Sequence, residues 1–281
     1  MREVTVFTHR RPDEIRGALD ELIGAAAECG VTLRFDPEET SKLALKPSPS
    51  VALDAEIKRD VELCMVLGGD GTILQALRHY SATGVPVFAV NFGEIGFLAT
   101  VEPENLAEGI RRAFEGDFEL LRLPAIRLQI GEEPLLAIND VAIHRKVGER
   151  VAELSYSIDG EEAGSVRCDG LVVATPAGST GYNLANGGPV MAWGVEGFIV
   201  SFIAPHSISA RALVAAPEDR LCVINRSREP LAVAVDGRPV GEIAAGGMIE
   251  ARFEKDLGTL AQLPGSSFYR RLREKFGRLA S

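Results

Sequence analysis

The sequence predicts an α/β domain built on a parallel sheet, followed by a β-rich domain. Strand-like and helix-like segments alternate over about the first 120 residues, and beyond that point apolar residues recur at every second position. Strands that form continuous apolar runs between helices are typical of a parallel sheet covered on both faces. We therefore expect one domain over 1–121, a second over 122–256 and a C-terminal segment over 257–281.

The first domain begins with a β-prone run at 4–7. A helix is expected next, because an apolar stripe recurs at spacings of three, four and seven residues. Its members are Ile15, Ala18, Leu19, Leu22, Ile23 and Ala26. Further strands are expected at 31–35, 64–67 and 85–91, and further helices at about 72–80 and 103–116. Pro103 suits the first position of the last helix, where the missing N–H has no consequence.

The segment 37–50 contains three prolines and several Ser and Thr residues. No apolar period is sustained across it. We expect a surface loop here, either a plain connection or a lid.

The second half has the two-residue period of strands with one buried face. It is clearest at 126–130, 152–158 and 231–236. Near the end of the chain, Phe268, Leu272 and Phe276 stand four residues apart among basic residues, which predicts an amphipathic terminal helix.

Composition excludes several classes of function. The formal net charge of −10, from 40 acidic against 30 basic residues, disfavours a nucleic-acid partner, because phosphate binding needs clustered Lys and Arg. No apolar run is long enough for a membrane span, and the start of the sequence has no signal-like region, so we expect a cytoplasmic protein. The four cysteines are dispersed, which favours buried, reduced thiols, and the four histidines form no helical pair, so no metal site of the protein's own is expected.

The motif Gly68-Gly69-Asp70-Gly71-Thr72 follows an apolar strand and opens a helix. Glycines let the backbone approach a ligand, and a helix N-terminus offers free N–H groups to phosphate oxygens. A carboxylate beside phosphates must hold a metal, face a hydroxyl or accept its proton, so Asp70 indicates phosphoryl transfer. The alternative is a tight turn with Asp70 as the helix N-cap.

Two further segments carry polar side chains suited to a ligand. The run 91–98, which begins with Asn91, follows the next strand, and loops at the carboxyl ends of parallel strands line one crevice. The run 169–183 combines a carboxylate, adjacent hydroxyls, a tyrosine and an amide, which are the groups that read a nucleoside. A polar turn with a capped helix start is the alternative for this run.

Taken together and in their order along the chain, the motifs resemble those of the NAD kinase family, and the resemblance covers essentially the whole chain. The segment from Thr-Pro to Gly-Gly-Pro is the specific part, because lipid kinases and, more loosely, phosphofructokinases share the Gly-Gly-Asp-Gly-Thr loop. The resemblance rests on 68–72, Asn91-x-Gly-x-x-Gly-Phe-Leu, Asn139-Asp140-Val141, Asp169-Gly170, Thr175-Pro176-x-Gly-Ser-Thr-x-Tyr and Gly187-Gly188-Pro189.

The resemblance implies a Rossmann-like N-terminal domain, against which the terminal helix packs, and a β-rich C-terminal domain, with the active site in the crevice between them. The implied reaction transfers a phosphoryl group from ATP to the adenosine-ribose 2′-hydroxyl of NAD and needs Mg²⁺. Another nucleoside triphosphate or polyphosphate stays open as the donor. Asp70 would be the general base. Nucleotide phosphates would bind at Gly68, Gly69, Gly71, Thr72 and Asn91.

A homotetramer or homodimer is expected, because the resemblance places Asp169 at a site shared between subunits and because the β-rich half must cover its sheet edges. The implied NAD contacts are Asn139, Asp140, Arg145, Lys146, Asp169, Thr180, Tyr182, Asn183 and Asp236, with Asp169 reaching a neighbouring subunit's ligand. For Arg145 and Lys146 a solvated strand end is the alternative to a site beside the new 2′-phosphate. The sequence departs from the family pattern at Ala177, Gly181 and Arg238. The first departure removes a hydroxyl and the second enlarges the base pocket slightly, so these two affect the base contacts.

Two other functions stay open on the sequence alone. One is a lipid or sugar kinase that uses the same glycine loop, although the second half has no amphipathic or basic membrane face. The other is a non-catalytic dinucleotide sensor, which would have no need of Asp70. Thermal stabilisation by NAD, diacylglycerol or fructose 6-phosphate would distinguish the three.

Overall fold

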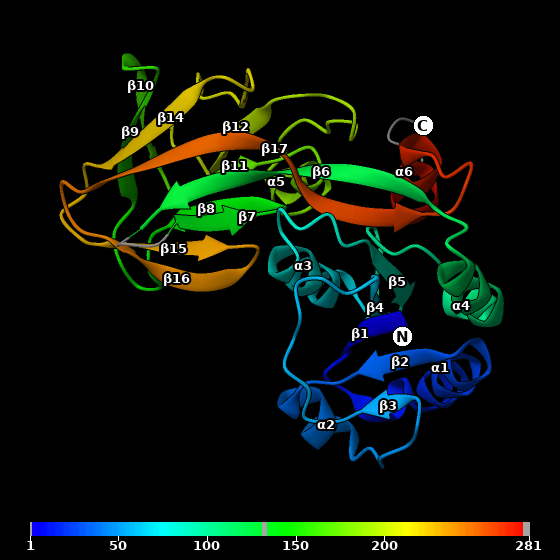
Figure 1. The fold of residues 1–281 in the computed structure, drawn as a ribbon. Coiled ribbons are helices and arrows are strands. Elements are labelled where there is room, and N and C mark those ends of the chain that lie inside the picture. Colours follow the sequence, from blue (N-terminus) through cyan, green and yellow to red (C-terminus); the bar gives the residue numbers. More distant parts are fainter. Residues whose placement is uncertain (1, 131–133, 278–281) are drawn as a thin grey trace. The chain divides into compact units, whose positions relative to one another are not determined.

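The computed structural model describes residues 2–130 and 134–277, and the chain forms two compact units. The first unit contains the residues up to Arg122 and those from Gly258 onward, and the second contains Leu123–Leu257. The two boundaries expected from the sequence fall after 121 and 256. The last four residues of the expected C-terminal segment lie outside the described part. Each unit is described by itself below (Figure 1).

A parallel sheet forms the centre of the first unit. Its strand order is β5-β4-β1-β2-β3, and every pairing among these strands is parallel. The last part of β17 (Met248–Gln262) adds a further parallel pairing, between Leu260 and Val87 of β5. The α/β class expected for this part of the chain is thus confirmed. The strands are β1 (Arg2–Thr8), β2 (Val31–Arg34), β3 (Val51–Ala52), β4 (Leu63–Gly68) and β5 (Val87–Asn91).

Helices of the first unit bury their apolar stripes against this sheet. Residues of α1 and α4 belong to one cluster with alternate residues of the sheet, whereas α3 contacts β4 and β5. The helices are α1 (Arg16–Cys29), α2 (Pro37–Leu43), α3 (Asp70–His79), α4 (Leu106–Glu115) and α6 (Phe268–Phe276), with 3-10 turns at Pro12–Glu14 and Pro103–Asn105. The terminal amphipathic helix is confirmed, because Phe268 and Leu272 of α6 are buried.

The expectation of a loop over 37–50 is wrong for its first half, where α2 forms. Asp36 is the N-cap of this helix, and its carboxylate accepts a hydrogen bond of 2.7 Å from the backbone N–H of Glu39. Pro37 occupies the first helical position, which proline favours. The helix is too short for an apolar period to reveal it, whereas the capping residues could have done so.

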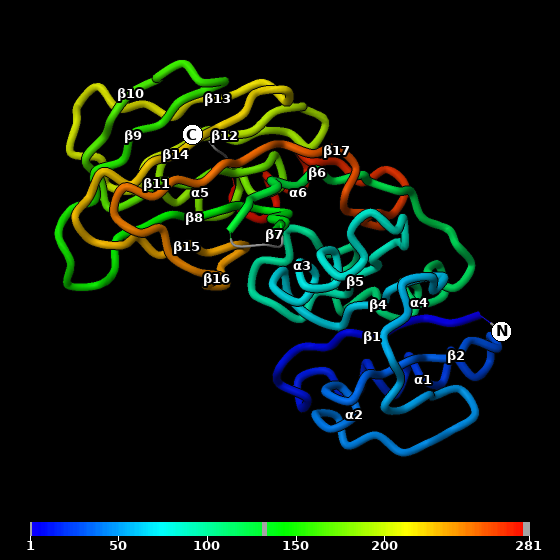
Figure 2. The backbone as a smooth tube through the Cα atoms, turned by 60° about the vertical axis from the view of Figure 1, so that its left-hand side comes forward, coloured from blue at the N-terminus to red at the C-terminus, as the bar shows by residue number. Residues whose placement is uncertain are grey.

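Two antiparallel sheets make up the second unit. One sheet has the strand order β13-β12-β11-β8-β15-β16. The other contains β10, β9, β14 and the first part of β17, in that order. In this second sheet, β6 pairs with both β7 and β17 (Figure 2). The β-rich class is confirmed. The strands are β6 (Glu119–Gln129), β7 (Pro134–Ala137), β8 (Asp140–His144), β9 (Ala152–Ile158), β10 (Glu161–Cys168), β11 (Gly170–Ala174), β12 (Phe198–Ile203), β13 (Leu213–Ala215), β14 (Arg220–Asn225), β15 (Leu231–Val235), β16 (Arg238–Ile243) and β17 (Met248–Gln262).

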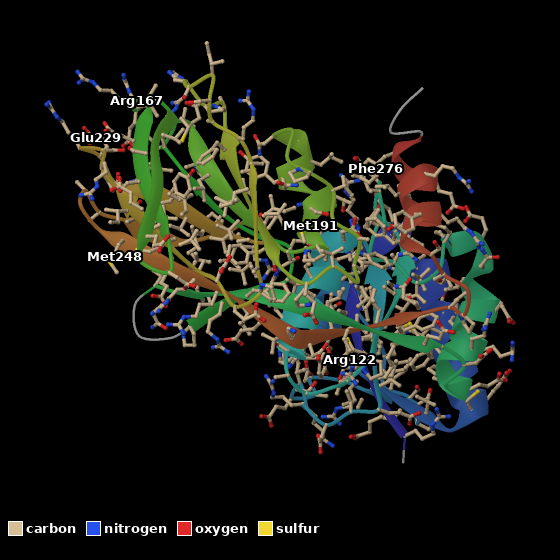
Figure 3. All side chains as sticks on the ribbon, turned by 90° about the horizontal axis from the view of Figure 1, so that it is seen from above. Arg122, Arg167, Met191, Glu229, Met248 and Phe276 are labelled. Carbon is tan, nitrogen blue, oxygen red and sulfur yellow. The ribbon has the colours of Figure 1, made fainter. Side chains whose placement is uncertain are left out.

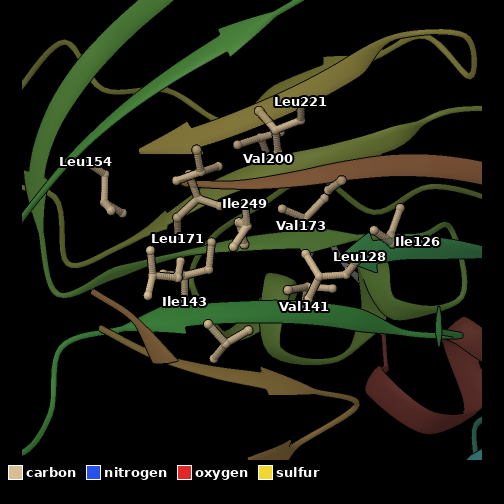
Figure 4. Close-up of a cluster of buried hydrophobic side chains, with 14 of the residues drawn as sticks. Ile126, Leu128, Val141, Ile143, Leu154, Leu171, Val173, Val200, Leu221 and Ile249 are labelled. Atoms are coloured by element: carbon tan, nitrogen blue, oxygen red, sulfur yellow. The ribbon is translucent and has the colours of Figure 1, made fainter. Parts of the chain in front are cut away.

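The core of the second unit lies between these sheets. Figure 4 shows Ile143 and Leu171 of one sheet together with Leu221 and Ile249 of the other. The opposite face of β11 is also buried, because Met191, labelled in Figure 3, packs in a cluster with Val172. Since both faces of β11 are covered, the turn that follows it has a fixed starting point. That turn contains a 3-10 turn (Gly178–Thr180) and the short helix α5 (Tyr182–Ala185).

All four cysteines are free thiols, as expected for reduced cysteines. Cys64 and Cys168 are buried, and burial raises the pKa of both thiols. Cys29 is exposed at the end of α1, so the expectation of burial is wrong for this residue. None of the helices in the described ranges is long and apolar enough to cross a membrane.

Candidate functional site

The glycine loop of the first unit joins β4 to α3. Gly68 ends β4, Gly69 is the N-cap of α3, and its carbonyl accepts hydrogen bonds of 2.9 and 3.1 Å from the N–H groups of Thr72 and Ile73. Asp70 is therefore the first helical residue, and the alternative that it serves as the N-cap is wrong. A Cβ on Gly71 would meet nothing within 4 Å, so the space above the helix start is open.

The carboxylate of Asp70 is held by the backbone of the second loop. Its Oδ2 accepts a hydrogen bond of 3.0 Å from the N–H of Phe97, and its Oδ1 one of 2.9 Å from the N–H of Leu98. Two consecutive amides thus fix the plane of the carboxylate. Each oxygen retains a lone pair for an incoming group. The motifs of the sequence had not indicated that these two amides belong to the site.

Asn91 shapes the second loop from within. Its side chain is buried, its Oδ1 accepts a hydrogen bond of 3.0 Å from the N–H of Gly93, and its Nδ2 donates one of 2.8 Å to Glu102. The two loops touch through backbone alone, because a Cβ on Gly93 would lie 2.7 Å from the Cα of Gly69. The expectation that the loops lie side by side is confirmed. A nucleotide contact by Asn91 stays a prediction.

In the second unit, Asp236 ties the end of one strand to the start of another. It adopts φ +45° in the turn between β15 and β16. Its carboxylate accepts hydrogen bonds from the N–H groups of Ile138 (3.2 Å), Asn139 (2.7 Å) and Asp140 (3.2 Å). A short polar side chain tolerates this left-handed conformation. Asp236 therefore builds the segment that carries Asn139 and Asp140.

Asp140 is a buried carboxyl with a strongly raised pKa. Its side chain is 7% exposed, and burial raises its pKa to about 7, with the negative charge of Asp236 acting in the same direction. A carboxyl with such a pKa is partly protonated near neutral pH. It can then donate as well as accept a hydrogen bond, which suits a ribose hydroxyl.

The Thr-Pro turn packs directly on the Asn-Asp segment. The hydroxyl of Thr175 donates a hydrogen bond of 2.6 Å to the carbonyl of Ile138, and the N–H of Thr175 donates one of 2.9 Å to the carbonyl of Asn139. Gly178 must be glycine here, because a Cβ would collide with the carbonyl of Asn139. Two motifs separated by about 35 residues are thus one structural element.

Thr180 and Asn183 lie inside the turn that they belong to. Asn183 is fully buried, and its Nδ2 donates hydrogen bonds of 2.9 Å to the carbonyls of Ser179 and Pro189. The hydroxyl of Thr180 donates one of 3.2 Å to the carbonyl of Ala177. Both side chains therefore shape the turn. Their contacts with a nucleoside stay a prediction.

A cavity of about 540 Å³ in the second unit brings five of the expected residues together. They are Asp140, Arg145, Lys146, Asp169 and Tyr182. His144 and Gly237 also line the cavity and had not been assigned to the site, although each adjoins an assigned residue. This arrangement gives the cavity an aromatic wall and both signs of charge.

Charge pairs border the cavity. Arg145 donates two hydrogen bonds to Asp169, of 2.6 and 3.2 Å, and this pairing lowers the pKa of the Asp169 carboxyl. Lys146 lies 2.7 Å from Glu242. Both cations line the cavity, and about a third of each side chain is exposed. A site beside the new 2′-phosphate stays a prediction for these two residues.

Comparisons with known proteins agree on one family. The model of the ATP-NAD kinase N-terminal domain matches residues 15–118, and the model of the ATP-NAD kinase C-terminal domain matches residues 138–253. An NAD kinase of Gemmatimonas aurantiaca is 31% identical over 98% of this chain and 95% of its own length. An NAD kinase of Lachnoclostridium phytofermentans is 36% identical over 79% of this chain and 82% of its own length.

Solved structures share the fold. The yeast NADH kinase complexed with NADH superposes with a TM-score of 0.88 at 24% identity, covering 100% of this chain and 89% of its own. An NAD kinase from Archaeoglobus fulgidus in complex with ATP superposes with a TM-score of 0.72 at 28% identity, covering 98% of each chain.

The buried carboxyl of Asp140 generates a prediction about stability and pH. Between the unfolded pKa of about 3.9 and about 7, the unfolded chain releases a proton that the folded chain retains, so the free energy of unfolding falls as pH rises. Asp140→Asn removes the group that titrates and with it this loss of stability. Relative to that of the native chain, the free energy of unfolding of the variant should rise by up to about 4 kcal/mol between pH 4 and pH 7, and by nothing further above pH 7.

Denaturation in urea at a series of pH values measures the difference. Asp20→Asn is the control, because it replaces an exposed carboxyl of α1. A pH-independent difference for Asp140→Asn would contradict the buried, partly protonated state.

Proposed function

This chain belongs to the ATP-NAD kinase family, and from that membership we propose how its residues divide the work of an NAD kinase. The first unit supplies the general base and the phosphate-binding loop, and the second supplies the contacts to NAD. The observation that carries this proposal is the carboxylate of Asp70, which two amides hold at the open start of a helix.

Asp70 is suited to accept a proton from a hydroxyl. Its carboxylate is fixed in direction, and general bases act only when the proton lies within hydrogen-bond reach. In the proposed step, Asp70 takes the proton of the adenosine-ribose 2′-hydroxyl, whose oxygen forms a bond to the γ-phosphorus of ATP. The bond from that phosphorus to the oxygen of ADP breaks, and NADP and ADP leave.

The glycine loop suits the phosphates of the donor. The first N–H groups of a helix have no partner within the helix, and the helix dipole adds a partial positive charge there. Gly69 and Gly71 leave this end of α3 uncovered by side chains. We place the γ-phosphate of ATP against these N–H groups.

We propose that Mg²⁺ enters with ATP. Magnesium is usually held by one or two carboxylates together with substrate phosphates and waters. The described residues contain no group of three or more acidic, histidine or cysteine side chains that could form a cage for it. The Asp70 carboxylate, whose oxygens each have one backbone partner, fits as a single ligand, and the metal would neutralise charge on the transferred group.

The cavity of the second unit suits the dinucleotide. Asp140 can exchange hydrogen bonds with ribose hydroxyls, Tyr182 is 42% exposed and offers its ring face to a base, and Arg145 and Lys146 offset the phosphate charge. Asp236 acts by holding this segment in place, because its carboxylate accepts hydrogen bonds from three backbone N–H groups of the segment. A contact of the Asn139 side chain with NAD stays a prediction. A lipid or sugar kinase and a non-catalytic sensor are set aside, because the match to the family covers both halves of the chain.

The proposed function predicts that the purified protein forms NADP from NAD when ATP and Mg²⁺ are present. The product can be followed with an NADP-specific dehydrogenase in a coupled assay. Chelation of the metal with EDTA should abolish the reaction, and excess Mg²⁺ should restore it. Folded protein that forms no NADP under these conditions would refute the proposal.

The substitution Asp70→Asn tests the general base. Turnover should fall by about 10²- to 10⁴-fold, the usual contribution of a general base, whereas NAD affinity should change little. The variant should also lose about 1 to 2 kcal/mol of stability, because the amide of Asn can accept a hydrogen bond from only one of the two N–H groups.

The matched control is Asp117→Asn, which removes a half-exposed carboxylate from the same unit. It should keep both turnover and NAD affinity. Near-native turnover of Asp70→Asn would remove Asp70 from the catalytic role.

We also propose a homodimer or homotetramer in the cytoplasm. The free thiols fit a reducing compartment. The edge strand β13 carries Leu213 and Val214 with exposed side chains, and an apolar edge is usually covered. Light scattering should give two or four times the mass of the chain, and Val214→Lys should lower it. A monomer with full activity would contradict this proposal.

A further inference from the structure

The terminal helix α6 is joined to the loop that holds Asp70. Both belong to the first unit. The helix reaches the loop over 91–102 through one arginine, one lysine and a pair of phenylalanines, of which Phe276 is labelled in Figure 3.

Arg271 makes the most direct contact. Its Nη1 donates a hydrogen bond of 2.7 Å to the carbonyl of Phe97 and another to the carbonyl of Ala99. Its Nη2 donates one of 2.8 Å to the side chain of Gln262 at the end of β17. The guanidinium is thus fixed from two sides, which an arginine fork allows and a lysine would not.

One peptide group lies between Arg271 and Asp70. The carbonyl of Phe97, which accepts from Arg271, and the N–H of Leu98, which donates to Asp70, belong to the same peptide bond. A trans peptide is planar, and its C=O and N–H point in opposite directions, so this group is a rigid spacer between a cation and an anion. The charges at its two ends polarise both hydrogen bonds in the same sense.

Electrostatics agree with this arrangement. Burial lowers the pKa of the Arg271 guanidinium, while the negative charges of Asp70 and Glu102 act in the opposite direction. A cation that is removed from water in this way needs acceptors in fixed positions. The two carbonyls and the Gln262 side chain supply them.

Further contacts hold the loop from its sides. The ring of Phe97 lies 5.9 Å from that of Phe268 and 5.8 Å from that of Phe276, measured between centroids. Lys275 of α6 pairs with Glu102, which in turn accepts from the side chain of Asn91. The helix therefore contacts the loop at Phe97, Ala99 and Glu102, and reaches Asn91 through Glu102.

We propose that Arg271 is a positioning residue for phosphoryl transfer, because it fixes the 97–98 peptide that orients the carboxylate of Asp70. This inference rests on the proposed role of Asp70 as the general base. The hydrogen bonds that carry the positioning role all lie within the first unit. The loss of Arg271 should therefore act on turnover and leave the NAD contacts of the second unit intact.

The test is a double-mutant cycle with Arg271→Ala, Asp70→Asn and the combined variant. Arg271→Ala should lower kcat by about 10- to 100-fold with little change in the KM for NAD, as expected when a reacting group is displaced by about 1 Å. In the Asp70→Asn background the same substitution should lower kcat by less than about threefold, because the group that it positions is already gone. Guanidinium at low millimolar concentration should restore part of the activity of Arg271→Ala.

Arg273→Ala is the control, since Arg273 is an exposed residue of the same helix. It should keep native kcat and gain nothing from guanidinium. Should Arg271→Ala fail to fold, as judged by circular dichroism, Arg271→Lys takes its place in the cycle. It keeps the charge but loses the fork, so kcat should still fall.

The outcomes separate the two proposals. Native turnover of Asp70→Asn overturns the role of Asp70 itself. A loss of turnover in Asp70→Asn, combined with native kcat in the Arg271 variant, overturns the positioning role. The positioning role is also overturned if the effects of the two substitutions multiply, because a merely structural role would act independently of Asp70.

Discussion

The first unit depends on a carboxylate that accepts hydrogen bonds from two successive backbone amides. The amides of Phe97 and Leu98 bind Asp70, and this interaction joins the loop after β5 to the start of α3. It can form only because the backbones of the two loops approach closely at Gly69 and Gly93. The position of the candidate base thus follows from a close approach that only glycines allow.

A similar interaction organises the second unit, with a different result. There the carboxylate of Asp236 accepts from three amides and is fully engaged in holding the Asn-Asp segment. Its neighbour Asp140 is left buried, with a pKa raised to about 7. Of two adjacent carboxyl groups, one builds the site and the other remains available to a ligand, because their surroundings differ.

The two units therefore use the same device, a carboxylate bound by backbone N–H groups, to fix irregular chain at the ends of strands. Loops carry function because rigid elements hold them in place. In the first unit that support includes α6, which follows the long strand β17. In the second it comes from β11, whose two faces are buried.

The sequence alone determined the fold class, the terminal helix and the family. Local signals suffice for these: the switch of apolar period near residue 120, the spacing of Phe268, Leu272 and Phe276, and motifs of consecutive residues. It failed at 37–43, where a helix of two turns is set by its cap and is too short to show a period.

Only the tertiary structure decided which contacts each candidate site residue makes. The partner of Asp70 lies 27 residues away, and Arg271 lies 174 residues from the carbonyl that it binds. Asn183, which its polarity suggested as a ligand contact, is fully buried and bonded within its own turn. The partially protonated state of Asp140 likewise depends on its burial and on the approach of Asp236. These features arise because folding brings segments that are distant in the sequence together in space. The spacing and type of neighbouring residues in the sequence do not reveal such pairings.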